Sequence, residues 1–177
     1  MASFTERIVR AAKLDVALYE EVEADTNALG QAMGVVVLSS IAAGLGSITQ
    51  GGVEGLILIT ISALIGWYVW AYLTYFIGAK LLPESQTHTN HGELLRTIGF
   101  ASSPGLIRVV GLIPGLTGIV FLIASIWMLV TMVVAVRQAL DYASTLRAVG
   151  VCVIGWVIQA LVLALLFAIV GSPPAPA

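Results

Sequence analysis

Four long stretches without a charged residue constrain this chain more than any other feature of its sequence. They are the residue ranges 29–48, 55–79, 116–136 and 149–170. A helix rises about 1.5 Å per residue, so roughly 20 apolar residues cross the hydrocarbon core of a bilayer. With 59% hydrophobic residues, 10% charged residues and a mean hydropathy of +1.00, the chain is too apolar for a soluble globular domain. The sequence therefore predicts an all-α integral membrane helical bundle.

The remaining length and charge exclude several other classes of protein. About five crossings and their loops occupy nearly all of the 177 residues, which leaves no room for a large extramembrane catalytic domain. Eight basic residues against ten acidic ones give a net charge of −2, so nucleic acid is not an expected partner. Cys152 is the only cysteine, which excludes an intrachain disulfide. The amino terminus lacks the pattern of a cleavable signal peptide, so we expect none.

Residues 1–28 are expected to form a cytoplasmic or interfacial unit built on one amphipathic helix. Apolar residues recur there at steps of three and four from residue 4 to residue 23, with charged residues between them. The basic residues Arg7, Arg10 and Lys13 come first, which favours a basic end near anionic lipid head groups. A helix packed under the bundle explains the same pattern, so both interpretations stay open.

The stretch 93–118 is interrupted by glycine and proline more than any other part of the chain. Pro104 and Gly105 should break or kink a helix there. If the stretch crosses the membrane, Arg96 and Arg108 would extend toward opposite interfaces. The alternative is a re-entrant hairpin, whose broken backbone needs a cover of protein or a wet cavity. We predict about five transmembrane helices within 29–171, the third short and kinked, and a disordered Pro/Ala tail at 172–177.

The basic residues also predict an orientation. With five crossings, seven of the eight lie on one side and only Arg108 lies on the other; with a re-entrant hairpin the ratio is six to two. Because basic residues gather on the cytoplasmic side, both arrangements put the amino terminus in the cytoplasm. The five-span arrangement puts the carboxyl terminus outside, and a bacterial inner membrane is favoured over a eukaryotic endomembrane.

Small residues at steps of four predict close helix packing. Such steps let helix backbones approach one another in lipid. The candidate packing residues are Ser40, Gly44, Thr97, Ala101, Gly105, Gly111 and Gly115. Aromatic residues cluster in the second half of the second span, between residues 67 and 76, where they either pack inside the bundle or line a pocket.

Charged residues near the interrupted stretch suggest a lipid site. Glu93 and Arg96 are three residues apart and can form an ion pair, and Arg137 and Arg147 should lie on the same side of the membrane. Together these groups would hold the phosphate of an anionic lipid, although the simpler interpretation is that they only fix the topology. The histidines at 88 and 91 lie in a segment typical of a solvated loop, so no metal ion is expected.

The segment that begins at Glu93 is similar to a motif of the Yip1 domain family. That motif has the form E-L-L-R-x-x-G-Y/F-A-x-x-P, and the matching residues are Glu93, Arg96, Gly99, Phe100, Ala101 and Pro104. Ile126-Trp127 and the connector after Val136 also resemble the family. The resemblance implies a five-span helical domain with a cytosolic amino terminus. Eukaryotic members act in membrane traffic with Rab-type GTPases through a long amino-terminal region, whereas this shorter chain resembles a prokaryotic relative.

Three functions are compatible with these features. The first is a non-enzymatic membrane-organising, trafficking-type or accessory subunit that acts through helix–helix association, as a homo-oligomer or within a larger complex. The second is a transporter of a small molecule, lipid or ion that uses the broken third segment, although the deepest strongly polar residue, Gln159, is neutral. The third, an intramembrane enzyme, is disfavoured because Ser102 and Ser103 have no base at a defined spacing. No cofactor is expected.

The candidate lipid- or partner-binding residues follow from the motif and the charges. They are Glu93, Arg96, Gly99, Phe100, Pro104, Arg108, Arg137 and Arg147.

Overall fold

The computed structural model describes residues 2–170, and the side chains of all of these except 48–55, 163 and 166–170. Every regular element in this range is a helix, which confirms the predicted all-α class. The α-helices are α1 (Phe4–Ala12), α2 (Val16–Ala24), α3 (Leu29–Gly46), α4 (Ile48–Thr74), α5 (His91–Ala101), α6 (Thr117–Ala139) and α7 (Thr145–Val170). Shorter helical turns are η1 (Thr26–Ala28) and η3 (Ser103–Leu112), both 3₁₀, and η2 (Tyr75–Leu81), a π-helix.

Among the described residues, four helices are long and apolar enough to cross a bilayer. They comprise Thr26–Gly46, Leu56–Leu81, Thr117–Ala139 and Thr145–Val162. Each overlaps one of the four uncharged stretches of the sequence, because a long apolar helix is more stable in a bilayer than in water. The structure thus has the helices of an integral membrane bundle.

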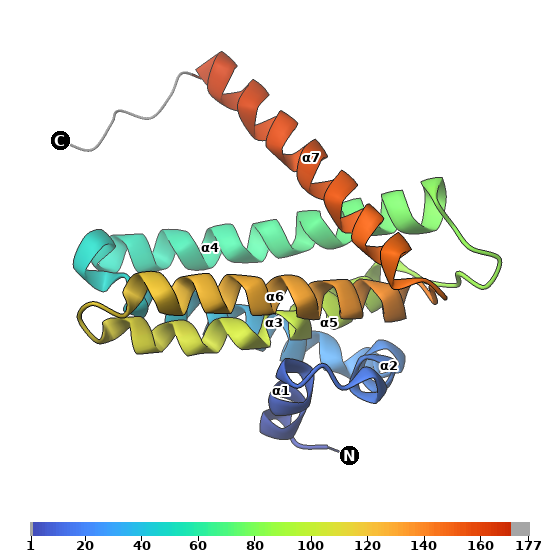
Figure 1. Ribbon diagram of the computed structural model, residues 1–177, viewed down its shortest axis with the longest axis horizontal. Helices are drawn as coiled ribbons and strands as arrows, with labels where there is room; N and C mark the ends of the chain where they lie inside the picture. The colour runs from blue at the N-terminus through green and yellow to red at the C-terminus, as the bar shows by residue number, and fades with distance from the viewer. Residues whose placement is uncertain (1, 171–177) are drawn as a thin grey trace.

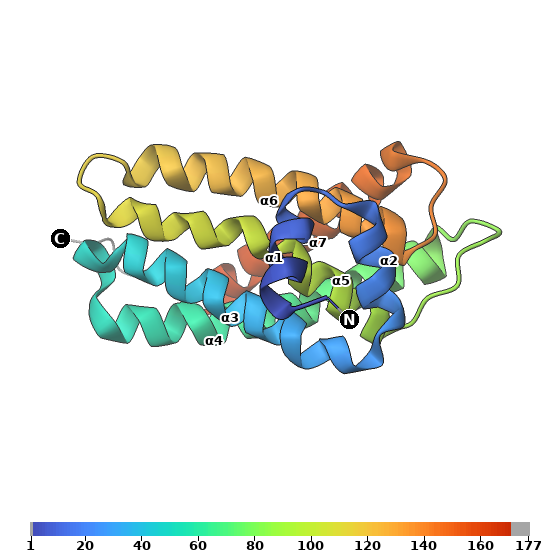
Figure 2. The same cartoon turned by 90° about the horizontal axis from the view of Figure 1, so that it is seen from below.

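The long helices α3 and α4 lie side by side, and the segment formed by α5 and η3 lies between α3 and α6 (Figures 1 and 2). Helices α1 and α2 cover one face of this bundle. Helix α7 starts against the bundle and then diverges from α4 and α6, so that its second half stands apart (Figure 1).

The amino-terminal segment is two helices, so the single helix predicted over residues 4–23 was wrong. The chain turns at Leu14, whose φ of 63° lies in the left-handed region. The Asp15 carboxylate then accepts a hydrogen bond from the Ala17 N–H at 3.0 Å and caps the start of α2. The apolar spacing continues across the turn because both helices face the same bundle, and this continuity concealed the break.

The basic residues of α1 pair with acidic residues of the following segments. The Arg7 guanidinium, only 3% exposed, donates to Glu21 and Asp25 at 2.9 Å each and to the Gln31 side chain at 2.9 Å. Arg10 pairs with Asp15 and Glu21 at 2.7 Å each. The basic residues of α1 are therefore paired within residues 7–31, and both interpretations of this unit stay predictions.

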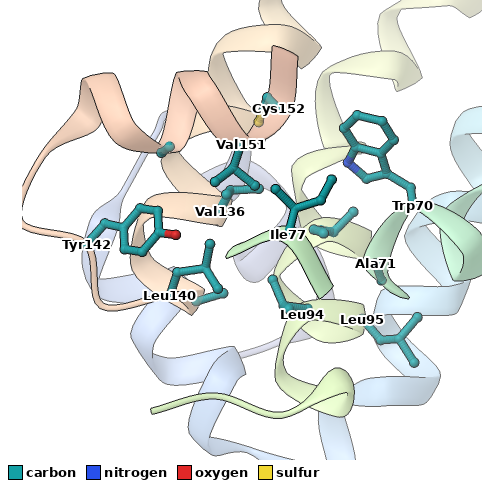
Figure 3. Close-up of a cluster of buried hydrophobic side chains, with 13 residues drawn as sticks. Trp70, Ala71, Ile77, Leu94, Leu95, Val136, Leu140, Tyr142, Val151 and Cys152 are labelled. Atoms are coloured by element: carbon teal, nitrogen blue, oxygen red, sulfur yellow. The ribbon is translucent and has the colours of Figure 1, made fainter. Parts of the chain in front are cut away.

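Two hydrophobic clusters hold the bundle together. The first joins α4, η2, α5, α6 and α7 around the buried side chains of Ile77, Leu94, Val136 and Leu140 (Figure 3). The Tyr142 hydroxyl, at the edge of this cluster, lies 2.9 Å from the Gly78 carbonyl oxygen and 2.7 Å from that of Leu82, where the π-helix ends.

The second cluster lies beneath α1 and α2. It buries Leu18, Tyr19 and Val22 of α2 against Val35 of α3 and Phe100 of α5. The two clusters bracket α5 from opposite sides and so fix the position of the broken third segment.

Candidate functional site

The broken segment begins as a well-capped α-helix. The Asn90 side chain accepts a hydrogen bond from the Glu93 N–H at 3.1 Å, and the Glu93 carboxylate accepts one from the Asn90 N–H at 2.9 Å. This reciprocal capping box satisfies two backbone donors that a helix start leaves free. Glu93 is thus used for capping, and it forms no ion pair with Arg96 in the described structure, contrary to the prediction.

The α-helix ends at Ala101, and the chain continues as the 3₁₀ turns of η3. Pro104 lies in the first turn of η3, where it lacks an N–H and cannot continue the α-helical ladder. Side chains satisfy carbonyls freed by the change: the Ser103 hydroxyl donates to Phe100 at 2.6 Å and the Thr131 hydroxyl donates to Ala101 at 2.7 Å. The predicted kink is therefore a change of helix type held by hydroxyl groups.

Glycines let this segment lie directly against α3. A Cβ on Gly99 would approach the Ala32 Cβ to 2.7 Å, closer than any ordinary contact. A Cβ on Gly105 would collide with the Ser39 hydroxyl. The backbones of α3 and the third segment therefore touch without intervening side chains, as small-residue packing in membranes requires.

Most of the predicted packing residues are buried inside the bundle. Ser40, Gly44, Thr97, Ala101, Gly105 and Gly111 are all buried. Gly115 was assigned wrongly: it lies in the turn before α6 with a φ of +86°, and a Cβ there would meet nothing within 4 Å. The steps of four pack segments of this one chain against each other.

Three arginines lie on the side of the bundle that the sequence predicts to be cytoplasmic, and each binds different acceptors. Arg96, 6% exposed, donates to the Val22 carbonyl at 2.9 Å and to that of Glu23, at the end of α2. Arg137 donates to three oxygen atoms of the connector 142–145. Arg147 pairs with Glu84 at 3.1 Å and lies over the Tyr142 ring. Each of these three arginines is therefore bound to protein acceptors of its own, and a shared phosphate site stays a prediction.

Several acidic residues lie near one another at the end of α2. Burial, followed by the nearby carboxylates of Glu20, Asp141 and Glu93, raises the pKa of Glu23 to about 8, although Arg96 opposes the shift. One carboxylate oxygen of Glu23 is buried and has no hydrogen-bond partner among the described residues. Glu23 is therefore held largely protonated at neutral pH.

Arg108 of η3 extends toward α6. Its Nη2 donates to the Ser125 hydroxyl of α6 at 3.1 Å, and its guanidinium carbon lies 5.4 Å from the Phe121 ring centroid. Its Nε is buried and finds no acceptor within the described part of the chain. A charged side chain at the centre of a membrane helix costs about 2.5–3.5 kcal/mol on insertion scales, so such residues usually serve a function.

Two adjoining cavities open beside Arg108. The smaller, about 220 Å³, lies among α3, α4, α6 and the third segment, and the larger, about 350 Å³, lies between α4, α6 and α7. Both are lined by Trp70, Arg108, Met128 and Met132. Among the lining residues that the structure describes, Arg108 is the only charged one.

Trp70 supplies a second unpartnered donor at these cavities. It is 8% exposed, its ring lies 6.1 Å from that of Trp156 in α7, and its indole N–H is buried without a described acceptor. A buried donor left without an acceptor costs about 1–3 kcal/mol. The cavities thus combine a cation and an unsatisfied indole N–H within walls that are otherwise mostly apolar.

Sequence reasoning identified the components of this site but did not assemble it. It expected Arg108 to extend toward the interface, and it left open whether the aromatic cluster that includes Trp70 packs or lines a pocket. Both residues line the same two cavities, an arrangement that no spacing within one segment reveals. Comparison with protein-family models, with curated proteins and with solved structures gave no significant match.

Proposed function

We propose that this chain is a non-enzymatic membrane protein of five crossings that acts by associating with other membrane proteins. It would serve as a membrane-organising, trafficking-type or accessory subunit, the role that the resemblance to the Yip1 domain family implies. The proposal has two parts, the topology and the association, and each is supported by a different observation.

Five crossings are supported by the direction of the third segment. Gly99 faces Ala32, Gly105 faces Ser39 and Gly111 faces Gly46, so the segment follows α3 in parallel over most of its length. A re-entrant hairpin would reverse direction beside α3. Because α3 is itself long enough to cross, we take α5 and η3 together as the third crossing.

The charge distribution then supports an orientation. With five crossings, the basic residues of α1, the residues Lys80 and Arg96, and the pair Arg137 and Arg147 share one side. By the positive-inside rule that side is cytoplasmic, which puts the amino terminus inside and the carboxyl terminus outside. We propose a bacterial inner membrane as the location.

The observation that carries the association is the divergence of α7 from the bundle (Figure 1). Its apolar side chains Leu161 and Leu165 are 65% and 61% exposed, although the helix begins packed against α6. A spanning helix that stands apart from its own bundle leaves space for the helix of another subunit beside it. Small residues of the bundle are already used internally, so this helix provides the free surface.

Photo-crosslinking tests the association in native membranes. A photoreactive amino acid at Leu161 should give a discrete adduct of defined mass, either a second copy or a partner protein. The matched control is Leu122 on α6, which is 60% exposed and lies on a helix packed along its length. No adduct from Leu161, or equal adducts from both positions, would contradict the proposal.

Transport is the second candidate function, and the cavities beside the broken segment are the observation that favours it. Broken helices often lie next to the substrate sites of transporters. Flux of a small molecule, lipid or ion in proteoliposomes, lost on Pro104→Ala, would support transport. Equal flux in proteoliposomes and in liposomes without the protein would contradict transport.

A further inference from the structure

We propose that the cavities around Arg108 and Trp70 bind an anionic amphiphile. The Arg108 guanidinium and the Trp70 indole N–H would hold a carboxylate or phosphate head, and an acyl chain would occupy the space between α4, α6 and α7.

The buried donors without hydrogen-bond acceptors indicate which charge the ligand carries. The Arg108 Nε and the Trp70 Nε1 are both buried donors without an acceptor among the described residues. The one side-chain acceptor that Arg108 reaches in the described structure, the Ser125 hydroxyl, is neutral. A ligand that completes this site must therefore supply acceptor oxygens, and a negative charge would compensate the guanidinium in a low-dielectric environment.

The head group has a polar environment in the smaller cavity. The residues Ser39, Ser40 and Ser102 line it together with Arg108. The single O–H of Ser40 is already donated to the Val37 carbonyl at 2.8 Å, so Ser39 and Ser102 are the serines whose hydroxyls would donate to a bound head. An arginine with adjacent hydroxyls is a common arrangement for carboxylate and phosphate recognition.

The larger cavity defines the apolar body of the ligand. Its walls are formed mainly by Trp70, Met128, Met132 and Trp156, and methionine side chains adapt readily to flexible hydrocarbon. A volume of about 350 Å³ is within the range of small-molecule pockets. An inorganic anion would leave this apolar space empty.

The divergence of α7 provides a route for such a ligand. Helix α7 packs closely on α4 at Gly155, where a Cβ would lie 3.0 Å from the Trp70 ring. The second half of α7 diverges from α4 (Figure 1). The larger cavity lies at the base of this separation, lined by Gly66 of α4 and Gln159 of α7. In a bilayer the opening would face acyl chains, so an amphiphile could enter sideways with its head directed at Arg108.

Native mass spectrometry of the full chain in nanodiscs tests the proposal. The nanodiscs contain phosphatidylcholine with either phosphatidylglycerol or oleate added, and a third arm adds inorganic phosphate alone. We expect one anionic lipid or one oleate to be retained over phosphatidylcholine. Arg108→Gln should weaken retention about tenfold or more. Trp70→Phe keeps an aromatic side chain but removes the indole N–H, and it should weaken retention about threefold.

Two further variants separate the site from surface electrostatics and from misfolding. Gly66→Leu fills the larger cavity, and a Cβ at Gly66 meets nothing within 4 Å, so this variant should fold and lose acyl-chain binding. Gly30→Leu is its matched control, because Gly30 also meets nothing within 4 Å but does not line the cavities. Arg147→Gln removes an exposed arginine elsewhere and should leave retention unchanged.

Several results would overturn the proposal. Retention of phosphatidylcholine equal to that of both anionic amphiphiles would exclude an anion site. Equal losses in Arg147→Gln and Arg108→Gln would assign the effect to surface charge. Retention of inorganic phosphate alone, unaffected by Gly66→Leu, would exclude the amphiphile. Because the retained ligand is weighed on the protein in any oligomeric state, these results do not depend on whether subunits associate.

Discussion

Replacing Gly99 with alanine tests whether the third segment is inserted against α3. The new Cβ would lie 2.7 Å from the Ala32 Cβ and 3.1 Å from both the carbonyl carbon and the carbonyl oxygen of Ala32. These atoms belong to a helix backbone and its first side-chain atom, so no rotamer change relieves the contact. The two helices must separate, and overpacking of this kind costs about 1–3 kcal/mol.

A control glycine isolates this effect from helix propensity. Gly30, near the start of α3, meets nothing within 4 Å, so Gly30→Ala should be neutral or stabilise by up to about 1 kcal/mol. Both variants gain the same intrinsic preference for alanine. The difference between them therefore measures the close approach alone and should be about 1–3 kcal/mol.

Unfolding in mixed micelles, followed by tryptophan fluorescence, measures both free energies of unfolding. Combining Gly99→Ala with Ala32→Gly should restore part of the loss, because the closest of the three contacts is then removed. If Gly99→Ala and Gly30→Ala have the same free energy of unfolding, the third segment does not pack on α3 and the reasoning is refuted.

Three other substitutions test separate parts of the structure. Glu23→Gln should stabilise the protein most above pH 8. Because the pKa of Glu23 is raised, the free energy of unfolding is highest at low pH and declines as the pH rises and this carboxyl group ionises. Equal stabilisation at pH 5 and pH 9 in thermal melts would contradict this. Arg7→Gln should lower the free energy of unfolding by about 1–3 kcal/mol, measured in the same micelles, because three hydrogen bonds are lost. Tyr142→Phe should cost about 1 kcal/mol and speed amide exchange near Gly78, whereas unchanged exchange would exclude its role at the end of the π-helix.

The spanning helices could be predicted because their signal is local. A charge-free run ends where a charge or a turn residue appears, so the predicted second span, ending at Ala79, stops two residues from the observed end at Leu81. The break at Leu14 could not be predicted in this way. Its cause is the conformation of one residue, while the apolar spacing around it continues unchanged.

The candidate site could be predicted only in its components. The charge of Arg108 and the aromatic character of Trp70 are visible in the sequence, but the direction of each side chain depends on tertiary neighbours. The Arg108 side chain turns toward Ser125, seventeen residues away on another helix, and therefore extends into the bundle. Arg96 shows the same limit, since its acceptors at Val22 and Glu23 lie more than seventy residues earlier.

The topology of the third segment is the central claim, because it places the Arg108 cavities within the membrane. The measurement uses single cysteines at Ser85, Pro114 and Ser144, all exposed, in a Cys152→Ala background. Sealed vesicles of known orientation are labelled with a membrane-impermeant thiol reagent. Five crossings predict that Ser85→Cys and Ser144→Cys label from the cytoplasmic side and Pro114→Cys from the opposite side. Labelling of Ser85→Cys and Pro114→Cys from the same side, with Ser144→Cys on the other, would contradict the account.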